Sequence, residues 1–122
     1  FLIEQAVKYP PPMYHCLTNL LSSHDVTRIR TALSTSIDPH SLTREQQATF
    51  VISDSQNRRG ALRQRLAAAL QFAVPGVPCI YYGDEHGMNG FLDPFNRNRY
   101  IGQSGIYRES KVGISFIQKI YR

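Results

Sequence analysis

Two polar clusters in the sequence carry side chains that could hold a ligand. His24 and Asp25 follow one apolar run, and Asp84 and Glu85 follow a second. A carboxylate accepts hydrogen bonds and an imidazole can donate one, so each cluster could bind a polar molecule. A plainer alternative stays open for the first cluster, in which the pair caps the next helix and bonds to the backbone.

Two familiar kinds of catalytic chemistry do not fit the first cluster. Ser22, Ser23, His24 and Asp25 are consecutive, and because neighbouring side chains diverge they cannot line up as a Ser-His-Asp relay. His15, His24 and Asp25 lack the spacing of metal ligands, and the chain has no Cys-x-x-Cys pair. We therefore predict neither a hydrolase triad nor a metal site here.

The elements that precede the clusters predict that they lie close together. Residues 17–22 and 77–82 are short apolar runs typical of buried strands, and residues 57–74 between them have a helical pattern. Strands joined through a helix run parallel, so their carboxyl ends share one edge of the sheet. In α/β sheets and barrels this edge binds ligands. Two strands cannot form such a sheet alone, so we expect part of an α/β fold.

The segment 57–74 is the clearest helix in the chain. Arginines and Gln64 take one side, and Pro75-Gly76 ends it. The opposite face carries apolar residues at helical spacing, namely Leu62, Leu66, Leu70 and Ala73.

Further short helices are expected around this unit. We predict them at 1–8, 25–34, 42–50 and 108–122, with a capping box formed by Thr43 and Gln46. The long connection 26–56 should lie over a functional face.

Composition and charge restrict the function classes. The 122 residues carry a net charge of +5, but their one arginine cluster falls on the predicted helix and is better explained as a solvated face than as a nucleic-acid site. No apolar stretch reaches the length of a membrane span, and the N-terminus does not read as a signal peptide. Cys16 and Cys79 are expected to be buried thiols. The opening without Met suggests a chain cut from a longer one.

Two long motifs resemble one family. "NLLSSHDVTR" and "LQFAVPGVPCIYYGDEHGMNGFLDPFNR" are similar to the α-amylase family, glycoside hydrolase family 13, and above all to its neopullulanase, cyclomaltodextrinase and maltogenic amylase branch. The resemblance implies the C-terminal part of a (β/α)8 TIM barrel. Leu17–Ser22 would be strand seven and Val77–Tyr82 strand eight, and residues 1–122 would form a single partial domain.

The resemblance also implies roles for five residues. Asp25 would be the third essential carboxylate, which stabilises the transition state, and His24 would bind the same sugar. Asp93 and Arg97 match a pair that contacts the next sugar, although an ion pair that shapes the loop stays open. Arg28 resembles an arginine at the rim of the cleft.

The second cluster stays less clearly assigned. Structural and ligand roles are equally open for Asp84, while Glu85 is expected to fix its loop. Tyr81 and Tyr82 are expected in the core rather than as stacking platforms for a sugar.

The family's nucleophile and acid/base motifs are missing from this sequence. We therefore expect a fragment of a retaining α-glucan hydrolase that is inactive alone. Its partners would be an α-glucan oligosaccharide or cyclodextrin and the remainder of the barrel, with no nucleic acid and no membrane. The alternative is a non-catalytic carbohydrate-binding fragment. No cofactor is evident; the resemblance allows calcium in the parent protein, but no site is recognised here. Two unpaired cysteines slightly favour the cytoplasm.

Overall fold

The computed structural model describes residues 2–100, so the helix expected at 108–122 lies outside the described residues. The N-terminal part contains helices α1 (Leu2–Lys8) and α2 (Pro11–Cys16) and strand β1 (Thr18–Leu20). Helices α3 (Ile29–Ser34), η1 (Pro39–Ser41), α4 (Arg44–Thr49) and α5 (Asp54–Ala73) follow. Strand β2 (Val77–Cys79) and the short turns of helix η2 (Asp84–His86) and η3 (Phe95–Arg97) complete the described chain.

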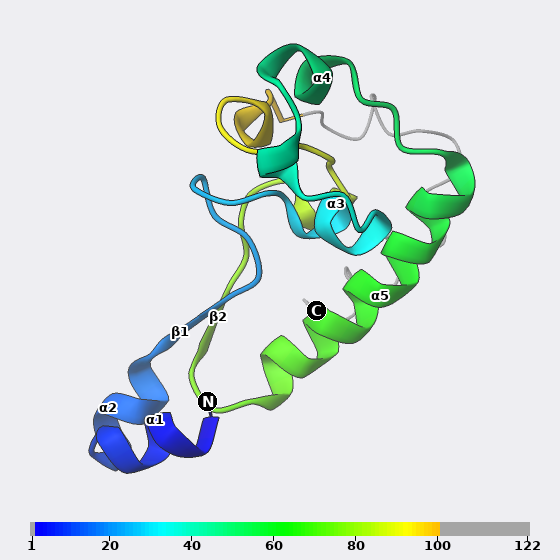
Figure 1. The fold of residues 1–122 in the computed structure, drawn as a ribbon. Helices are drawn as coiled ribbons and strands as arrows, with labels where there is room; N and C mark the ends of the chain where they lie inside the picture. Colours follow the sequence, from blue (N-terminus) through cyan, green and yellow to red (C-terminus); the bar gives the residue numbers. More distant parts are fainter. Residues whose placement is uncertain (1, 101–122) are drawn as a thin grey trace.

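The two strands form a parallel pair, as the sequence predicts. Thr18 pairs with Val77 and Leu20 with Cys79, although 59 positions separate the partners in the sequence (18 and 77). Figure 1 shows the consequence: both strands point toward the region that holds α3, α4 and the loop after β2. The carboxyl ends therefore open on one edge, while α1 and α2 lie at the opposite end.

The strands are shorter and more exposed than expected. They cover three residues each, within the predicted runs 17–22 and 77–82. Leu20 and Val77 are more than half exposed, and Cys16 and Cys79 are exposed free thiols, so the prediction of buried strands and buried thiols is wrong for this chain. A parallel strand is buried only when neighbours and helices cover it on all sides. The sheet described here has two strands.

Capping boxes explain where two of the helices begin. Thr43 and Gln46 make the predicted box at α4, with the Gln46 backbone N–H donating to Thr43 Oγ1 at 3.2 Å. An equivalent box at Ser53 and Gln56 starts α5 three positions before the predicted residue 57. Each box satisfies backbone donors that the first helical turn leaves unpaired. The helix ends after Ala73, in front of Pro75-Gly76.

Helix α5 turns its polar side toward the rest of the described chain. Leu62, Leu66 and Leu70 are 64, 65 and 57% exposed, whereas Gln64 and Gln71 are buried. The expectation that Gln64 lies on an outer polar side is therefore wrong. The buried amides donate to backbone carbonyls that need donors. Gln71 Nε2 donates to the strand carbonyls of Asn19 at 2.7 Å and Cys79 at 2.9 Å, and Gln64 Nε2 donates to the Asp84 carbonyl at 2.8 Å.

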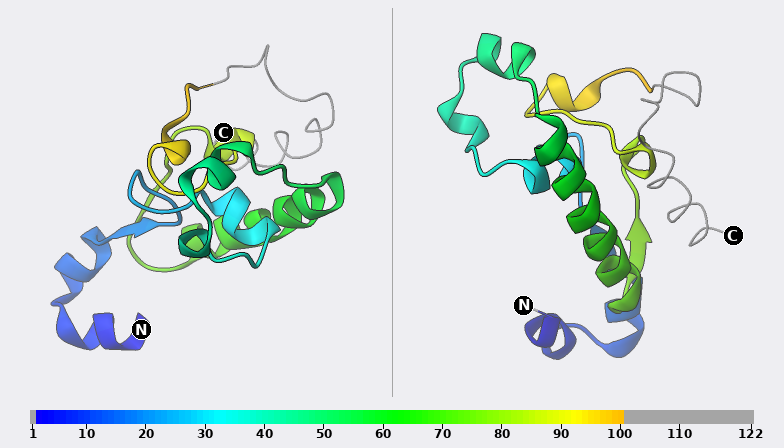
Figure 2. Two further views of the ribbon diagram at one scale, coloured as in Figure 1. Left: turned by 45° about the horizontal axis from the view of Figure 1, so that its top comes forward. Right: turned by 90° about the vertical axis from the view of Figure 1, so that its right-hand side faces the viewer.

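Helix α3 packs against the first half of α5 (Figure 2). A glycine lies at this contact. Gly60 is buried, and a Cβ built on it would overlap the Ser34 hydroxyl and lie 3.1 Å from the Arg30 carbonyl oxygen. Ser34 cannot easily move, because its hydroxyl donates to that same carbonyl at 2.7 Å. The two helices can approach this closely only at a residue without a side chain.

Replacing this glycine tests the helix contact. Gly60→Ala should lower the thermal unfolding midpoint of the protein, because overpacking costs about 1–3 kcal/mol and outweighs the ~1 kcal/mol that alanine gains in helix propensity. The double variant Gly60→Ala/Ser34→Gly should recover part of the loss. A Gly60→Ala protein that unfolds at a higher temperature than the wild type would contradict this packing.

Candidate functional site

His24 and Asp25 lie in the loop between β1 and α3, and both side chains face solvent. Their side chains are 58 and 71% exposed, and His24 Nε2 lies 3.1 Å from Asp25 Oδ1. Neither residue caps α3: its N-cap is Arg28, and no side chain bonds to that cap. The Ile29 backbone N–H instead donates to Ser22 Oγ at 2.9 Å. The capping alternative is therefore wrong, and the imidazole and carboxylate face outward at the strand edge.

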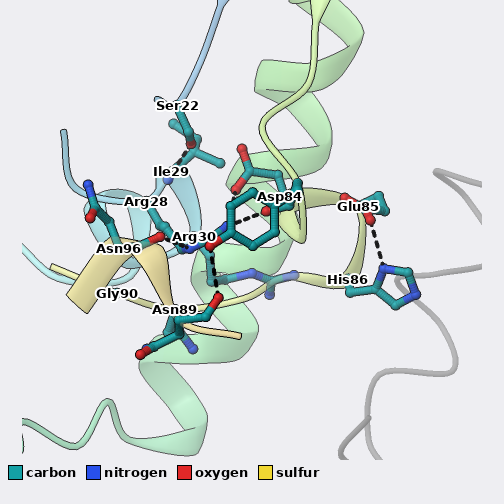
Figure 3. A network of polar contacts seen from close by, with 12 residues as sticks. Ser22, Arg28, Ile29, Arg30, Asp84, Glu85, His86, Asn89, Gly90 and Asn96 are labelled. Carbon is teal, nitrogen blue, oxygen red and sulfur yellow. Dashed lines mark hydrogen bonds and ion pairs between the residues drawn. The ribbon is translucent and has the colours of Figure 1, made fainter. Parts of the chain in front are cut away.

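Arg28 occupies the interior between the two loops. We expected it at a rim, but it has no exposed surface. Its Nη1 donates to the Tyr82 carbonyl at 2.7 Å and to Asp84 Oδ1 at 3.3 Å, and its Nε donates to the Asn96 carbonyl at 2.9 Å. Figure 3 shows Arg28 between Asp84 and Asn96. One guanidinium thus joins the loop after β1 to three points of the chain after β2.

Aromatic rings complete the surroundings of this guanidinium. The Cζ of Arg28 lies 4.7 Å from the ring centroids of both Tyr81 and Tyr82. Such contacts favour a desolvated guanidinium, because the ring faces are electrostatically negative. Tyr82 is nevertheless 39% exposed, so it does not lie in a closed core as expected.

Asp84 is the buried carboxylate of the site. Burial raises its pKa to about 6, although the hydrogen bond from Ser22 and the charge of Arg28 act in the opposite direction. Gln64 Nε2 donates to its backbone carbonyl at 2.8 Å and so connects the turn to α5. Asp84 therefore holds the loop together from inside. Its neighbour Glu85 also acts within the loop, with Oε1 lying 3.1 Å from His86 Nδ1.

A second cation lies behind this network. Arg30 Nε donates to Gln64 Oε1 at 2.8 Å, and its Nη1 donates to the Asn57 carbonyl at 3.2 Å. Burial and the nearby charge of Arg65 lower the pKa of Arg30 to about 10. Arg30 therefore connects α3 to α5 next to the loops of the site.

Asp93 and Arg97 form a pair on the second loop. Arg97 Nε lies 2.8 Å from Asp93 Oδ1, with the two side chains about half exposed. Asn96 lies between these two residues in the sequence. Its side-chain amide donates to the carbonyls of His24 at 2.8 Å and Val26 at 2.9 Å. The structure thus brings the loops of the predicted site residues together. Asn96 itself was missed, although its place in "DPFNR" next to Arg97 was the available signal.

Further bonds join the same two loops. The Arg28 backbone N–H donates to the Gly90 carbonyl at 3.0 Å, and the Gly90 N–H donates to Thr31 Oγ1 at 2.9 Å. Thr31 Oγ1 in turn lies 3.1 Å from Asn89 Oδ1. Gly83 and Gly87 adopt left-handed backbone conformations, with φ of 84° and 71°, which lets the chain turn sharply on each side of η2.

The part of the chain that the structure describes contains neither a cluster of metal ligands nor a membrane-spanning helix. Over residues 2–100, no three His, Cys, Asp or Glu side chains are grouped so that they could hold a metal ion. In the same part of the chain, every helix is too short or too polar to cross a membrane.

The geometry and the comparisons define the class of protein. Parallel strands joined through a helix, with polar loops at their carboxyl ends, are typical of α/β folds whose site lies at that edge. A family model described as the alpha amylase catalytic domain matches residues 5–119. The chain therefore belongs to the α-amylase family, whose catalytic domain is a (β/α)8 barrel.

Individual relatives agree with this assignment. The chain is 39% identical over 93 residues to an amylopullulanase from Thermoanaerobacter thermohydrosulfuricus. These residues cover 76% of this chain and 6% of that protein. It is 33% identical to a cyclomaltodextrinase from a Bacillus species, covering 75% of this chain and 12% of the relative. It is also 33% identical to neopullulanase 2 from Thermoactinomyces vulgaris, and this alignment covers 82% of this chain and 13% of the relative. No solved structure matches the chain significantly.

The raised pKa of Asp84 predicts a pH dependence of stability. Between pH 4 and pH 6, approximately, the folded state binds more protons than the unfolded state, whose carboxyl has a pKa near 3.8. The free energy of unfolding therefore falls as the pH rises through this window. Asp84→Asn removes this contribution, so its unfolding midpoint relative to the wild type should rise from pH 4 to pH 7. A difference that stays constant with pH would contradict the assignment.

A double-mutant cycle tests the pairing of Arg28 with Asp84. Arg28→Met leaves a buried carboxylate without its cation and should destabilise the protein by about 3–5 kcal/mol. Arg28→Met combined with Asp84→Asn should cost less than the sum of the single changes, by at least ~1 kcal/mol. Thermal unfolding of the four proteins measures this difference. Strictly additive losses would show that the two side chains are not coupled.

Proposed function

We propose that this chain is the C-terminal part of the catalytic barrel of an α-glucan-cleaving glycoside hydrolase. Residues 1–122 form a single partial domain in this proposal, with β1 and β2 as the seventh and eighth strands of the barrel. The chain spans only 6, 12 and 13% of three relatives named for activities on pullulan or cyclomaltodextrin. The remaining strands, and the remaining catalytic groups, belong to other parts of the protein.

The observation that carries this proposal is the parallel pairing of β1 with β2. It places the His24–Asp25 loop and the loop that carries Asp93 at one edge, where side-chain and backbone bonds join them. Ligand sites of (β/α)8 enzymes lie at the carboxyl ends of the strands. An exposed acid and imidazole at this edge suit a hydroxyl-rich ligand such as an α-glucan oligosaccharide or a cyclodextrin.

Asp25 acts as the transition-state-stabilising carboxylate in this mechanism. Retaining glycosidases use one carboxylate as nucleophile and another as acid/base, and the sugar ring distorts toward an oxocarbenium ion. Asp25 accepts hydrogen bonds from sugar hydroxyls, and His24 donates a further bond to the same sugar. Bonds that strengthen in the distorted ring lower the barrier to cleavage, because they stabilise the transition state more than the bound substrate.

Sugar binding changes the contact between these two side chains. His24 Nε2 and Asp25 Oδ1 are 3.1 Å apart, so the imidazole contacts one carboxylate oxygen. A hydroxyl group that donates to Asp25 and accepts from His24 satisfies both partners at once. Asp93 and Arg97, which pair with each other on the facing loop, bind the neighbouring sugar in the same way.

Arg28 is assigned to support rather than to sugar contact. The sequence resemblance implies a position at the rim of the cleft, but Arg28 has no exposed surface. Its bonds to the Tyr82 and Asn96 carbonyls hold the two site loops at a set separation. It therefore serves the reaction through the shape of the cleft.

The test of this proposal is Asp25→Asn in the intact protein that carries this chain. The amide keeps the size of the side chain but replaces one acceptor oxygen with a donor, so kcat on cyclodextrin or maltotriose should fall by several orders of magnitude. Asp54→Asn, at an exposed carboxylate at the start of α5, is the matched control and should retain wild-type kcat. Near-wild-type turnover by Asp25→Asn would refute the assignment. An intact protein that binds maltotriose but cleaves no α-glucan would favour a non-catalytic carbohydrate-binding role.

A further inference from the structure

The loop that carries His24 and Asp25 has no regular structure of its own. It lies between the end of β1 at Leu20 and the start of α3 at Ile29, and the two site side chains project into solvent. Groups that act on a reacting sugar must be held within about 0.5 Å of their working positions. Inside the loop the Asp25 backbone N–H donates to Ser23 Oγ at 3.1 Å and the Ile29 N–H donates to Ser22 Oγ at 2.9 Å, and further rigidity must come from outside the loop.

Asn96 supplies it from the facing loop. Asn96 is completely buried, and its side-chain Nδ2 donates to the carbonyls of His24 at 2.8 Å and Val26 at 2.9 Å. These two carbonyls lie on either side of Asp25 in the sequence. The bonds therefore restrain the peptide group that enters Asp25 and the one that follows Val26, and with them the direction of the Asp25 side chain.

The contact requires hydrogen-bond donors on the Asn96 side chain. Both partners are carbonyl oxygens, which only accept hydrogen bonds, so the donor side of the Asn96 amide must face them. Its Oδ1 is buried without a hydrogen-bond partner among the described residues, so the side chain contributes its two donors there.

Asn96 is itself held in place by the neighbouring residues. Its backbone carbonyl accepts from Arg28 Nε at 2.9 Å, and the next residue, Arg97, donates its backbone N–H to the Pro94 carbonyl at 3.0 Å. Arg28 and the carbonyls of His24 and Val26 belong to one loop, so the contacts form a closed ring between the two segments. A displacement of Asn96 would consequently move the Asp25 loop.

We propose that Asn96 is the positioning residue for the transition-state carboxylate Asp25, acting through the backbone on both sides of it. The inference rests on the proposed function, because it presumes that Asp25 acts on the sugar. Asn96 does not touch the substrate in this account. It affects the rate through the placement of Asp25, which matters more in the transition state than in the bound substrate.

The test is Asn96→Asp in the intact protein, with Asn98→Asp as the matched control. Both variants change one amide of the same loop to a carboxyl, but the Asn98 side chain is exposed. Asn96→Asp removes both donors, so kcat on β-cyclodextrin or maltotriose should fall by about 10–100-fold, while KM changes less than about threefold. Asn98→Asp should stay within about twofold of wild type in both constants.

Lowering the pH supplies a second readout, taken only at pH values where the variant is fully folded, because protonation of a buried carboxyl also raises stability. Protonation of the introduced carboxyl restores one donor, so the kcat of Asn96→Asp relative to wild type should rise as the pH falls from about 8 to about 5. Asn96→Ser, which keeps one short donor, covers the case in which the carboxyl variant fails to fold, and its kcat should also fall by more than KM changes.

Three outcomes would overturn the inference. The first is a folded Asn96→Asp or Asn96→Ser protein with wild-type kcat, and the second is a loss that appears only in KM. Both leave the proposed function intact if Asp25→Asn, measured alongside, is inactive. The third is Asp25→Asn with normal turnover, in which case the proposed function fails and the role of Asn96 fails with it.

Discussion

The arrangement of the site loops depends on one buried cation. Arg28 is inaccessible to solvent, yet it reaches the Tyr82 carbonyl, the Asp84 carboxylate and the Asn96 carbonyl. A guanidinium suits this position because its planar donors diverge in fixed directions, which a lysine ammonium cannot reproduce. The cost of burying the charge is offset only while all these partners are present. The strand ends and the loop after β2 therefore keep their relative positions as one unit.

Polar contacts, rather than apolar ones, determine how these elements meet. Among the described residues Phe91 is the one buried hydrophobic side chain, whereas Gln64, Gln71 and Asn96 are buried amides. Each amide donates to backbone carbonyls of the strands or loops. Hydrogen bonds are directional, so such an interior specifies the orientation of loops more narrowly than apolar packing does. A site built on loops benefits from that property.

The sequence predicted the parts of the fold that depend on local pattern. The helix at α5, the capping box at Thr43 and the parallel strands follow from periodicity, side-chain chemistry and chain connectivity, and all are observed. Burial was predicted poorly, because it depends on what lies next to an element in space. The interior position of Arg28 and the bonds of Asn96 were missed for the same reason: their partners lie 54 to 72 positions away in the sequence.

The errors in the predicted burial also have a physical explanation. Leu62, Leu66 and Leu70 are exposed on α5 while polar residues of the same helix are buried, and the apolar strand residues Leu20 and Val77 are exposed as well. An amphipathic helix and a parallel sheet are stable when such surfaces are covered. In a closed (β/α)8 barrel each strand has two neighbouring strands and each helix packs on the sheet and beside other helices. Under the proposal that this chain is a partial barrel domain, these exposed surfaces are the ones that the remaining strands and helices would cover.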